Sequence, residues 1–501
     1  MDKIVVIDYG SNYNEMLIRQ LRDEGVYSVL LPHRATKEDI LNLHHVKGII
    51  LSGGPCSVHD AFHDEFDSEL LELNIPILGI CYGMHILAEH LGGKIKSKGI
   101  TEYGKAVAKI DTKCPLFYDI PDETVVWMSH EDYVSELTGV SIIAETNRWP
   151  ISGFQKDNLY GVQFHPEVVG TEFGVKMLSN FINICQAART WDIVTFLDEK
   201  VKEIQETVGN HKVLLALSGG AASAVAALVL HKAIGDKLEC IFIDNGLFRK
   251  NEVEHIMDMF ETKFPLDVRK VDSQDVFVKR LKGVKDPEDK RRIVGLSFFD
   301  IFKAEARKIK GLKFLAEGNL YRANTEAFGL LNKKLVDNLD YGKAGYTLLE
   351  PLADLYKDEV RWLGEKLGLD EIFNKRQPFP SAGMARRIIG EVTKEKLEII
   401  KEADYILAKE IKAAGLRRDI WQYFCVLTNV KSVGLLNRNI NYNYTIAIRC
   451  ITSNDGVSSD FFRFDHETLA LISNRLVNEV KGVNRVVYDI TATPPSTIEW
   501  E

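Results

Sequence analysis

Residues 77–85 read Ile77-Leu78-Gly79-Ile80-Cys81-Tyr82-Gly83-Met84-His85. A short apolar run passes here into a helical pattern through a tight Gly-x-Cys-x-Gly turn, which is typical of a buried strand followed by a helix. Similar apolar runs occur at Lys3–Asp8 and at residues 48–52, with a helical pattern at residues 14–24 between them. The alternation predicts an α/β unit with a parallel sheet covered on both faces, closing near Ala187.

Composition limits the class of protein. The chain has 501 residues, of which 45% are apolar, with 63 Lys and Arg against 72 Asp and Glu and a net charge of −9. A prior of about 150 residues per domain gives about three domains. The negative charge argues against non-specific nucleic-acid binding. The chain has no apolar run of about 18 residues and no signal-peptide layout at its N-terminus, so we expect a cytoplasmic protein without membrane partners.

The seven cysteines are scattered and form no CxxC pair, which argues against disulfides and against a metal site. Cys81, however, stands at the strand-to-helix turn, where the helix dipole and nearby N–H groups favour a thiolate and stabilise an oxyanion. Far downstream, residues 160–167 read Tyr-Gly-Val-Gln-Phe-His-Pro-Glu. His165 and Glu167 can therefore act as base and orienting carboxylate. A lone buried cysteine is more often a packing residue, but the two motifs together favour catalysis.

These motifs resemble those of the class I glutamine amidotransferases, in which a Cys-His-Glu triad hydrolyses glutamine to glutamate and ammonia. The resemblance implies a triad of nucleophile, base and partner formed by Cys81, His165 and Glu167. It implies that the Ser-Gly-Gly-Pro loop at residues 52–55 helps to form the oxyanion hole, with Gly54 and Tyr82 as donors. His85 stands where the family usually has glutamine, so it is expected to hold the substrate glutamine with a different donor pattern.

A second strand-to-helix turn follows in the middle of the chain. The apolar run Lys212–Leu217 leads through Ser218-Gly219-Gly220 into a small-residue helix that begins at Ala221. This region reads as α/β, whereas a long helical pattern at residues 394–414 and strand-like stretches later in the chain predict an α+β region. We therefore predict three domains, at residues 1–188, 189–376 and 377–501.

The order of these elements is similar to that of the glutamine-hydrolysing GMP synthases, over essentially the whole chain. The shared segments include residues 213–220, 244–247, 376–380, 390–393, 419–422 and 484–501. The resemblance implies a middle ATP-pyrophosphatase-like domain that adenylates xanthosine monophosphate (XMP) with Mg-ATP, and ammonia that displaces AMP to give GMP. It also implies a last domain that supports a homodimer. The nucleotide-binding residues implied by the resemblance are Ser218, Gly219, Gly220, Ser223 and Asp244.

Several positions depart from the family pattern where the ATP and XMP chemistry is expected. The family loop Ser-Gly-Gly-Val-Asp-Ser reads Ser-Gly-Gly-Ala-Ala-Ser here, so Ala222 replaces the carboxylate that helps to hold magnesium. The family's Lys-Ser-His-His-Asn run is missing from residues 325–346, and its Phe-Pro-Gly-Pro-Gly loop reads Phe-Pro-Ser-Ala-Gly at residues 379–383. Thr493 replaces a phosphate-binding lysine of the family. These changes argue against Mg-ATP as a cofactor.

Three hypotheses remain open at this point. The chain is a glutaminase that needs no cofactor and passes ammonia to a repurposed synthetase domain, where a nucleotide or another small molecule accepts it. Alternatively, it is an authentic divergent GMP synthase, or a non-catalytic protein that senses a nucleotide.

The basic run at Lys290 to Arg292 predicts a solvated helix face, with a phosphate contact as the alternative.

Overall fold

The computed structural model describes residues 1–59, 66–264, 266–319, 345–370, 377–380, 382–436, 439–453 and 458–501. The chain divides into two compact units, Met1–Phe196 and Leu197–Glu501, which are described separately below. The second unit contains both regions that the sequence predicts as separate domains, and the boundary after residue 376 stays a prediction. Among the described residues, no helix has both the length and the apolar character that crossing a bilayer would require.

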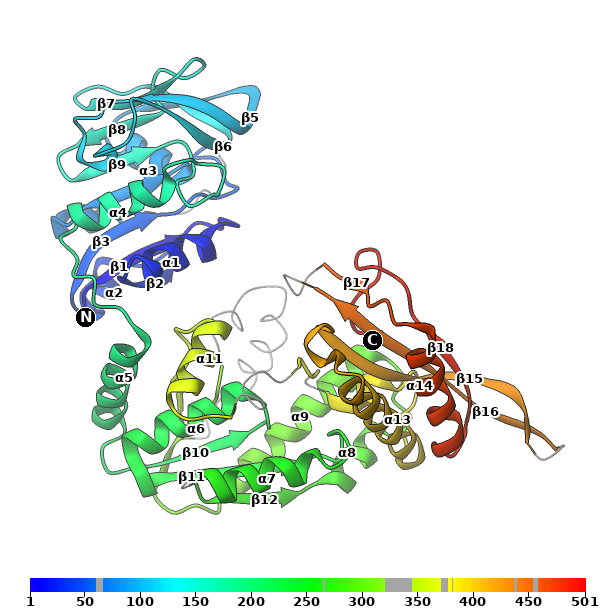
Figure 1. Ribbon diagram of the computed structural model, residues 1–501. Helices are drawn as coiled ribbons and strands as arrows, with labels where there is room; N and C mark the ends of the chain where they lie inside the picture. Colours follow the sequence, from blue (N-terminus) through cyan, green and yellow to red (C-terminus); the bar gives the residue numbers. More distant parts are fainter. Residues whose placement is uncertain are drawn as a thin grey trace. The chain divides into compact units, whose positions relative to one another are not determined.

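The first unit is built on a nine-stranded mixed sheet in the order β2-β1-β3-β4-β9-β8-β7-β5-β6 (Figure 1). The first five strands of this order pair in parallel, which confirms the predicted α/β class. The remaining pairs are antiparallel. The strands are β1 (Lys3–Asp8), β2 (Tyr27–Pro32), β3 (Val46–Leu51), β4 (Ile77–Ile80), β5 (Lys94–Ile110), β6 (Glu123–Glu136), β7 (Ser141–Thr146), β8 (Gly153–Lys156) and β9 (Leu159–Val162).

The parallel half of this sheet is apolar on both faces because helices cover it. Buried side chains of β1, β3 and β4 pack with those of α3 in one hydrophobic cluster. The helical segments of the unit are α1 (Asn14–Asp23), α2 (Lys37–Asn42), η1 (Ser68–Leu73), α3 (Tyr82–His90), η2 (Pro115–Phe117) and α4 (Gly174–Ile184).

The second unit contains a parallel five-stranded sheet in the order β12-β11-β10-β13-β14. The strands are β10 (Lys212–Leu217), β11 (Leu238–Asp244), β12 (Val268–Asp272), β13 (Leu312–Ala316) and β14 (Thr347–Leu349). The helical segments before and between these strands, and after β14, are α5 (Ile193–Val208, which begins before the unit boundary), α6 (Ala221–Ile234), η3 (Gly235–Lys237), α7 (Glu252–Lys263), α8 (Gln274–Leu281), α9 (Pro287–Ala306) and α11 (Lys357–Lys366).

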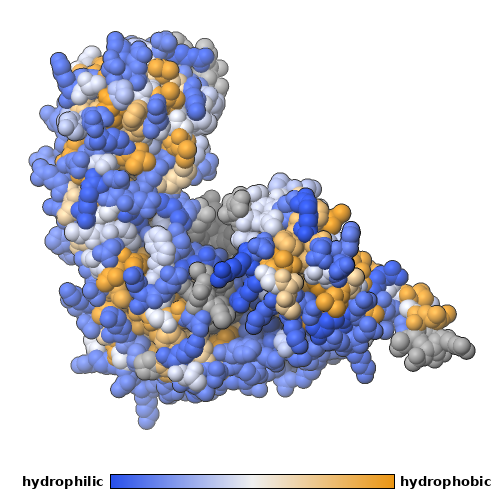
Figure 2. Space-filling view, in the orientation of Figure 1, coloured by the Kyte–Doolittle hydropathy of each residue, from blue (hydrophilic) through white to orange (hydrophobic). Residues whose placement is uncertain are grey.

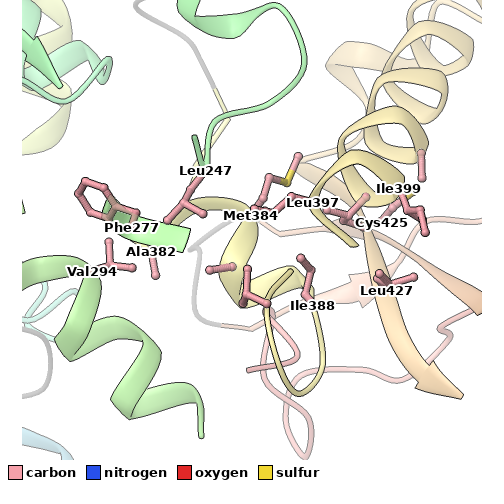
Figure 3. Close-up of a cluster of buried hydrophobic side chains, with 14 of the residues drawn as sticks. Leu247, Phe277, Val294, Ala382, Met384, Ile388, Leu397, Ile399, Cys425 and Leu427 are labelled. Atoms are coloured by element: carbon pink, nitrogen blue, oxygen red, sulfur yellow. The ribbon is translucent and has the colours of Figure 1, made fainter. Parts of the chain in front are cut away.

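A second, mainly antiparallel sheet follows in the same unit. β15 pairs with β16, and β16 also pairs with β17 and, in parallel, with β18. One buried cluster joins the two sheets, because Leu247 and Phe277 pack in it together with Met384, Ile399 and Cys425 (Figure 3). The elements are η5 (Gly383–Arg387), α13 (Lys394–Ala413), η6 (Leu416–Arg418), β15 (Gln422–Leu436), β16 (Asn439–Thr452), β17 (Asp460–Phe461), α14 (His466–Glu479) and β18 (Val483–Tyr488).

The basic run on α9 is only partly a solvated face. Arg291 and Arg292 form ion pairs with the acidic residues of the preceding turn. Lys290 is fully buried, and its Nζ donates to the carbonyl oxygen of Ile388 (2.6 Å) and to Glu501 Oε2 (2.5 Å). The prediction is therefore wrong for Lys290, because a carboxylate at the end of the chain compensates its charge inside the protein.

Candidate active site

Cys81 lies on a strained turn between β4 and α3. Its backbone has a φ of 51° and a ψ of −105°, a conformation that residues other than glycine rarely adopt. The flanking glycines allow this turn, since a Cβ at Gly79 would lie 2.4 Å from the carbonyl oxygen of Gly83, and a Cβ at Gly83 would lie 2.3 Å from that of Leu51. The Gly-x-Cys-x-Gly pattern thus follows from close backbone packing at the start of the helix.

His165 and Glu167 form a buried pair just after β9. His165 Nδ1 lies 2.8 Å from Glu167 Oε1, and the two residues are 3% and 2% exposed. Because Nδ1 faces the carboxylate, Nε2 is the ring nitrogen left for proton transfer. Burial disfavours the charged imidazole, but the carboxylate of Glu167 and the sulfur of Cys81 outweigh burial and raise the pKa of His165 well above its usual value.

The loop after β3 borders both Cys81 and His165. A Cβ at Gly53 would lie 2.9 Å from Cε1 of His165 and 3.7 Å from Cβ of Cys81, so both side chains border this glycine. Gly54 also packs closely, since its Cβ would lie 2.3 Å from the carbonyl oxygen of Tyr9. The resulting cavity has a volume of about 490 Å³, and the predicted residues that line it are Cys81, His165, Gly54, Tyr82 and His85.

His85 lies one helical turn after Cys81 and is only 3% exposed. Its Nε2 lies 2.8 Å from Oε1 of Gln163, and Nε2 of Gln163 in turn lies 3.8 Å from the sulfur of Cys81. Burial lowers the pKa of His85 to about 4, so the imidazole is neutral at pH 7. Sequence reasoning did not single out Gln163. Its position could have identified it: Gln163 comes immediately after β9, and β9 pairs in parallel with β4 up to Ile80 and Val162, so Gln163 and Cys81 follow neighbouring strand ends.

The second unit holds a separate cavity at the Ser-Gly-Gly turn between β10 and α6. Its volume is about 550 Å³, and Ser218, Gly220, Ala221 and Ala222 line it together with mainly apolar residues of the same unit. Gly219 adopts a φ of 77°, which fits its place in a tight turn. The sequence-predicted loop therefore borders a cavity large enough for a small-molecule ligand.

Ser223 and Asp244 lie outside the described lining of this cavity. The hydroxyl of Ser223 donates to the carbonyl oxygen of Gly220 (3.0 Å) and accepts from the N–H of Ser218 (3.2 Å), so it closes the turn. Asp244 is 3% exposed, and its carboxylate accepts from the N–H of Gly246 and from Gln274 Nε2, both at 3.0 Å. Both side chains thus form hydrogen bonds to neighbouring protein groups and are not among the described residues that line the cavity.

Known protein families match the first part of the chain and its last part. Residues 5–185 match the family model of class-I glutamine amidotransferases, and residues 409–500 match that of the GMP synthase C terminal domain. The chain is 48% identical over 508 residues to a protein of Bacillus subtilis (strain 168) named GMP synthase (glutamine-hydrolyzing), covering 100% of this chain and 99% of that protein. The chain belongs to the glutamine-hydrolysing GMP synthase family. Its relative of the same name in Bacillus velezensis has the same identity and coverage.

Membership of the GMP synthase family confirms the resemblance inferred from the sequence, and with it the amidotransferase class of enzyme. A crystal structure of a glutamine amidotransferase from Thermotoga maritima also matches, with 19% identity and a TM-score of 0.28, over 40% of this chain and 85% of that chain.

The magnesium ion implied by the ATP chemistry of the GMP synthase family needs oxygen ligands at the glycine turn. Ala222 offers none from its side chain. The carboxylate of Asp244 is engaged by Gln274 and by Lys270, whose Nζ lies 3.3 Å from Oδ2. Within the described ranges, no group of three or more His, Cys, Asp or Glu side chains converges as a metal site. The side chain at position 222 of this loop therefore contributes no oxygen ligand.

Proposed function

We propose that the first unit hydrolyses glutamine to glutamate and ammonia, with Cys81 as nucleophile, His165 as base and Glu167 as the carboxylate that orients the base. The observation that carries the proposal is the buried 2.8 Å contact between His165 and Glu167 beside the cavity that Cys81 lines. The raised pKa of His165 favours an imidazolium next to a thiolate, which is the reactive form of such a pair.

In the first step the Cys81 thiolate attacks the side-chain carboxamide carbon of glutamine, and the carbonyl π electrons move onto oxygen. Backbone N–H groups at Gly54 and Tyr82, which border the same cavity, stabilise this oxyanion. Nε2 of His165 gives its proton to the nitrogen, the C–N bond breaks, and ammonia leaves a thioester on Cys81. His165 then removes a proton from water, the hydroxide attacks the thioester carbon, and the C–S bond breaks, which releases glutamate and returns the Cys81 thiolate beside the protonated His165. These reaction steps need no cofactor.

We further propose that the second unit does not aminate XMP with Mg-ATP, and that its cavity binds a nucleotide or another small molecule that accepts ammonia. Ala222 lines this cavity where magnesium would need an oxygen. Thr493, in place of the family's lysine, carries no charge, and its hydroxyl accepts from the buried Arg449 (3.3 Å). The change predicted at residues 325–346 lies outside the described residues except for the last two.

A second candidate function is that of an authentic GMP synthase, which forms GMP from XMP, ATP and glutamine. It is favoured by 48% identity to relatives of that name over the full length of this chain. In that case side chains other than that of residue 222 would complete the magnesium site. Both candidates share the glutaminase step and differ in the second unit.

One experiment separates these functions. The purified chain is given glutamine alone and, separately, ammonia with XMP and Mg-ATP, and glutamate, AMP, pyrophosphate and GMP are measured. The proposal predicts glutamate that disappears in Cys81→Ala, and no AMP or GMP. GMP formation would establish the second candidate instead. Nucleotide binding without glutamate or GMP would identify a non-catalytic sensor.

We also propose a homodimer formed through the β15–β16 hairpin. Its strands pair Val433 with Tyr442 and Leu435 with Ile440, and these four side chains are 57–75% exposed. They form an apolar face near the end of the hairpin (Figure 2), which a second copy would cover. Leu435→Lys should halve the mass measured by light scattering, whereas Val107→Lys, at an exposed apolar site of the first unit, should not.

A further inference from the structure

We infer that His85 and Gln163 act together as positioning residues for Cys81: His85 holds the side-chain amide of Gln163 so that its N–H points at the Cys81 sulfur. The contacts form a chain, from His85 Nε2 to Gln163 Oε1 (2.8 Å) and from Gln163 Nε2 to Cys81 Sγ (3.8 Å). The inference rests on the proposed glutaminase function of the first unit and assigns its His85 a role other than contact with glutamine.

The tautomer of the neutral His85 decides which way the amide points. A neutral imidazole has one N–H, and with Nε2 protonated it donates to the amide oxygen of Gln163. The amide nitrogen is then the atom that faces the sulfur. The opposite orientation would bring the amide oxygen to Cys81, where two electron-rich atoms would repel each other and disfavour the thiolate. His85 thus selects the orientation that stabilises a negative sulfur.

The backbone holds this pair in place. Gln163 is fully buried, and its N–H donates to the carbonyl oxygen of Ser152 (2.9 Å). The N–H of Cys81 donates to the carbonyl oxygen of Val162 (2.8 Å), so the chain just before Gln163 is tied to the nucleophile. Gln163 has no exposed surface, so its amide can respond to substitution of His85 by rotating about its last bond.

His165 and Gln163 therefore have different roles at Cys81. His165 exchanges protons with the reacting groups, whereas Gln163 supplies a fixed donor that stabilises the thiolate before substrate arrives. His85 acts on Cys81 through Gln163, so its replacement should change the titration of Cys81 even without glutamine. A side chain that only binds glutamine would change the KM and leave that titration alone.

The test measures alkylation of Cys81 by iodoacetamide in the full chain between pH 5 and 10, quantified by mass spectrometry of the peptide that contains Cys81. The variants are His85→Ala, His85→Gln and Gln163→Met, which keeps the length of the side chain and removes the donor. His90→Ala, at an exposed position of the same helix, is the matched control. All variants retain the other titratable groups near the pair, namely His59, Tyr103, His130, Glu131, Asp132 and His165.

We expect His85→Ala and Gln163→Met to raise the alkylation midpoint by about one pH unit, which corresponds to about tenfold less thiolate below the midpoint. His85→Gln should restore the midpoint, because its amide can also donate to Gln163, and His90→Ala should leave it unchanged. Wild-type midpoints in both His85→Ala and Gln163→Met would overturn the inference, and a higher KM for glutamine in the His85 variants would then make His85 a substrate ligand. If the midpoints shift while the wild type releases no glutamate, the positioning role holds and the proposed function fails.

Discussion

Replacing Glu167 by Gln removes the charge that faces His165 and keeps an oxygen that can accept from Nδ1. The pair lies at 2.8 Å with both residues almost fully buried, so solvent screens it little. A hydrogen bond to a charged group contributes about 1.5–3 kcal/mol. With about 1.4 kcal/mol per factor of ten, kcat/KM for glutamine hydrolysis should fall about 10- to 100-fold in Glu167→Gln.

The pH dependence should change in a defined direction. The carboxylate contributes to the raised pKa of His165, and the thiolate–imidazolium form is lost as pH rises through that pKa. Glu167→Gln lowers the pKa of His165, so the alkaline limb of the pH–rate profile should move to lower pH. The same pair stabilises the fold fully below the unfolded pKa of about 6.5 and loses this effect as pH rises through the folded pKa.

The variant should also be less stable for a second reason. Glu167 Oε2 is buried and has no hydrogen-bond partner among the described residues. In the variant this position can carry an NH₂ group, and a buried donor without a partner costs about 1–3 kcal/mol. The difference in Tm between wild type and variant should therefore be largest near pH 6 and become smaller, without vanishing, as the pH rises.

The assay follows glutamate release between pH 6 and 10, with thermal unfolding measured in the same buffers. Glu172→Gln is the matched control, since this glutamate lies five positions later and is exposed. Wild-type kcat/KM in Glu167→Gln, or an alkaline limb that stays in place, would refute the assignment of Glu167 as the partner of His165.

Three further predictions concern other parts of the chain. Gly83→Ala places a Cβ 2.3 Å from the carbonyl oxygen of Leu51, so the turn must move, and glutamate release and Tm should both fall. Lys290→Met leaves a buried carboxylate without its cation and should lower the free energy of unfolding of the second unit by about 3–5 kcal/mol. Arg292→Met removes an exposed ion pair and should lower it by at most about 1 kcal/mol. Equal shifts in Tm for the two variants would contradict this prediction. Ala222→Asp should tighten ATP binding, measured by calorimetry, only when magnesium is present, and a gain that persists in EDTA would exclude a role of the new carboxylate in holding the metal.

Local sequence patterns were sufficient where neighbours along the chain decide the conformation. The β4–Cys81–α3 turn follows from apolar residues and glycines within nine positions, and the family motifs around His165 and Glu167 lie within eight. The parallel part of the first unit's sheet and the parallel sheet of the second unit follow from alternating strand and helix patterns. These elements were predicted because strand pleating, helix periodicity and close glycine packing all depend on short spacings.

Tertiary structure decided the partners of the polar side chains. Lys290 reads as a solvated residue on a charged helix, yet it is buried against Glu501, 211 positions away. The prediction that His85 holds glutamine stays a prediction, and the structure adds that its Nε2 contacts Gln163, 78 positions away. Asp244 is held by Gln274 and Lys270. The sequence alone determined the family and the α/β class, and it singled out Cys81 as the proposed nucleophile. Only the folded chain shows which charges are compensated and which donors face the sulfur, because burial and hydrogen-bond geometry depend on groups that the sheets bring together.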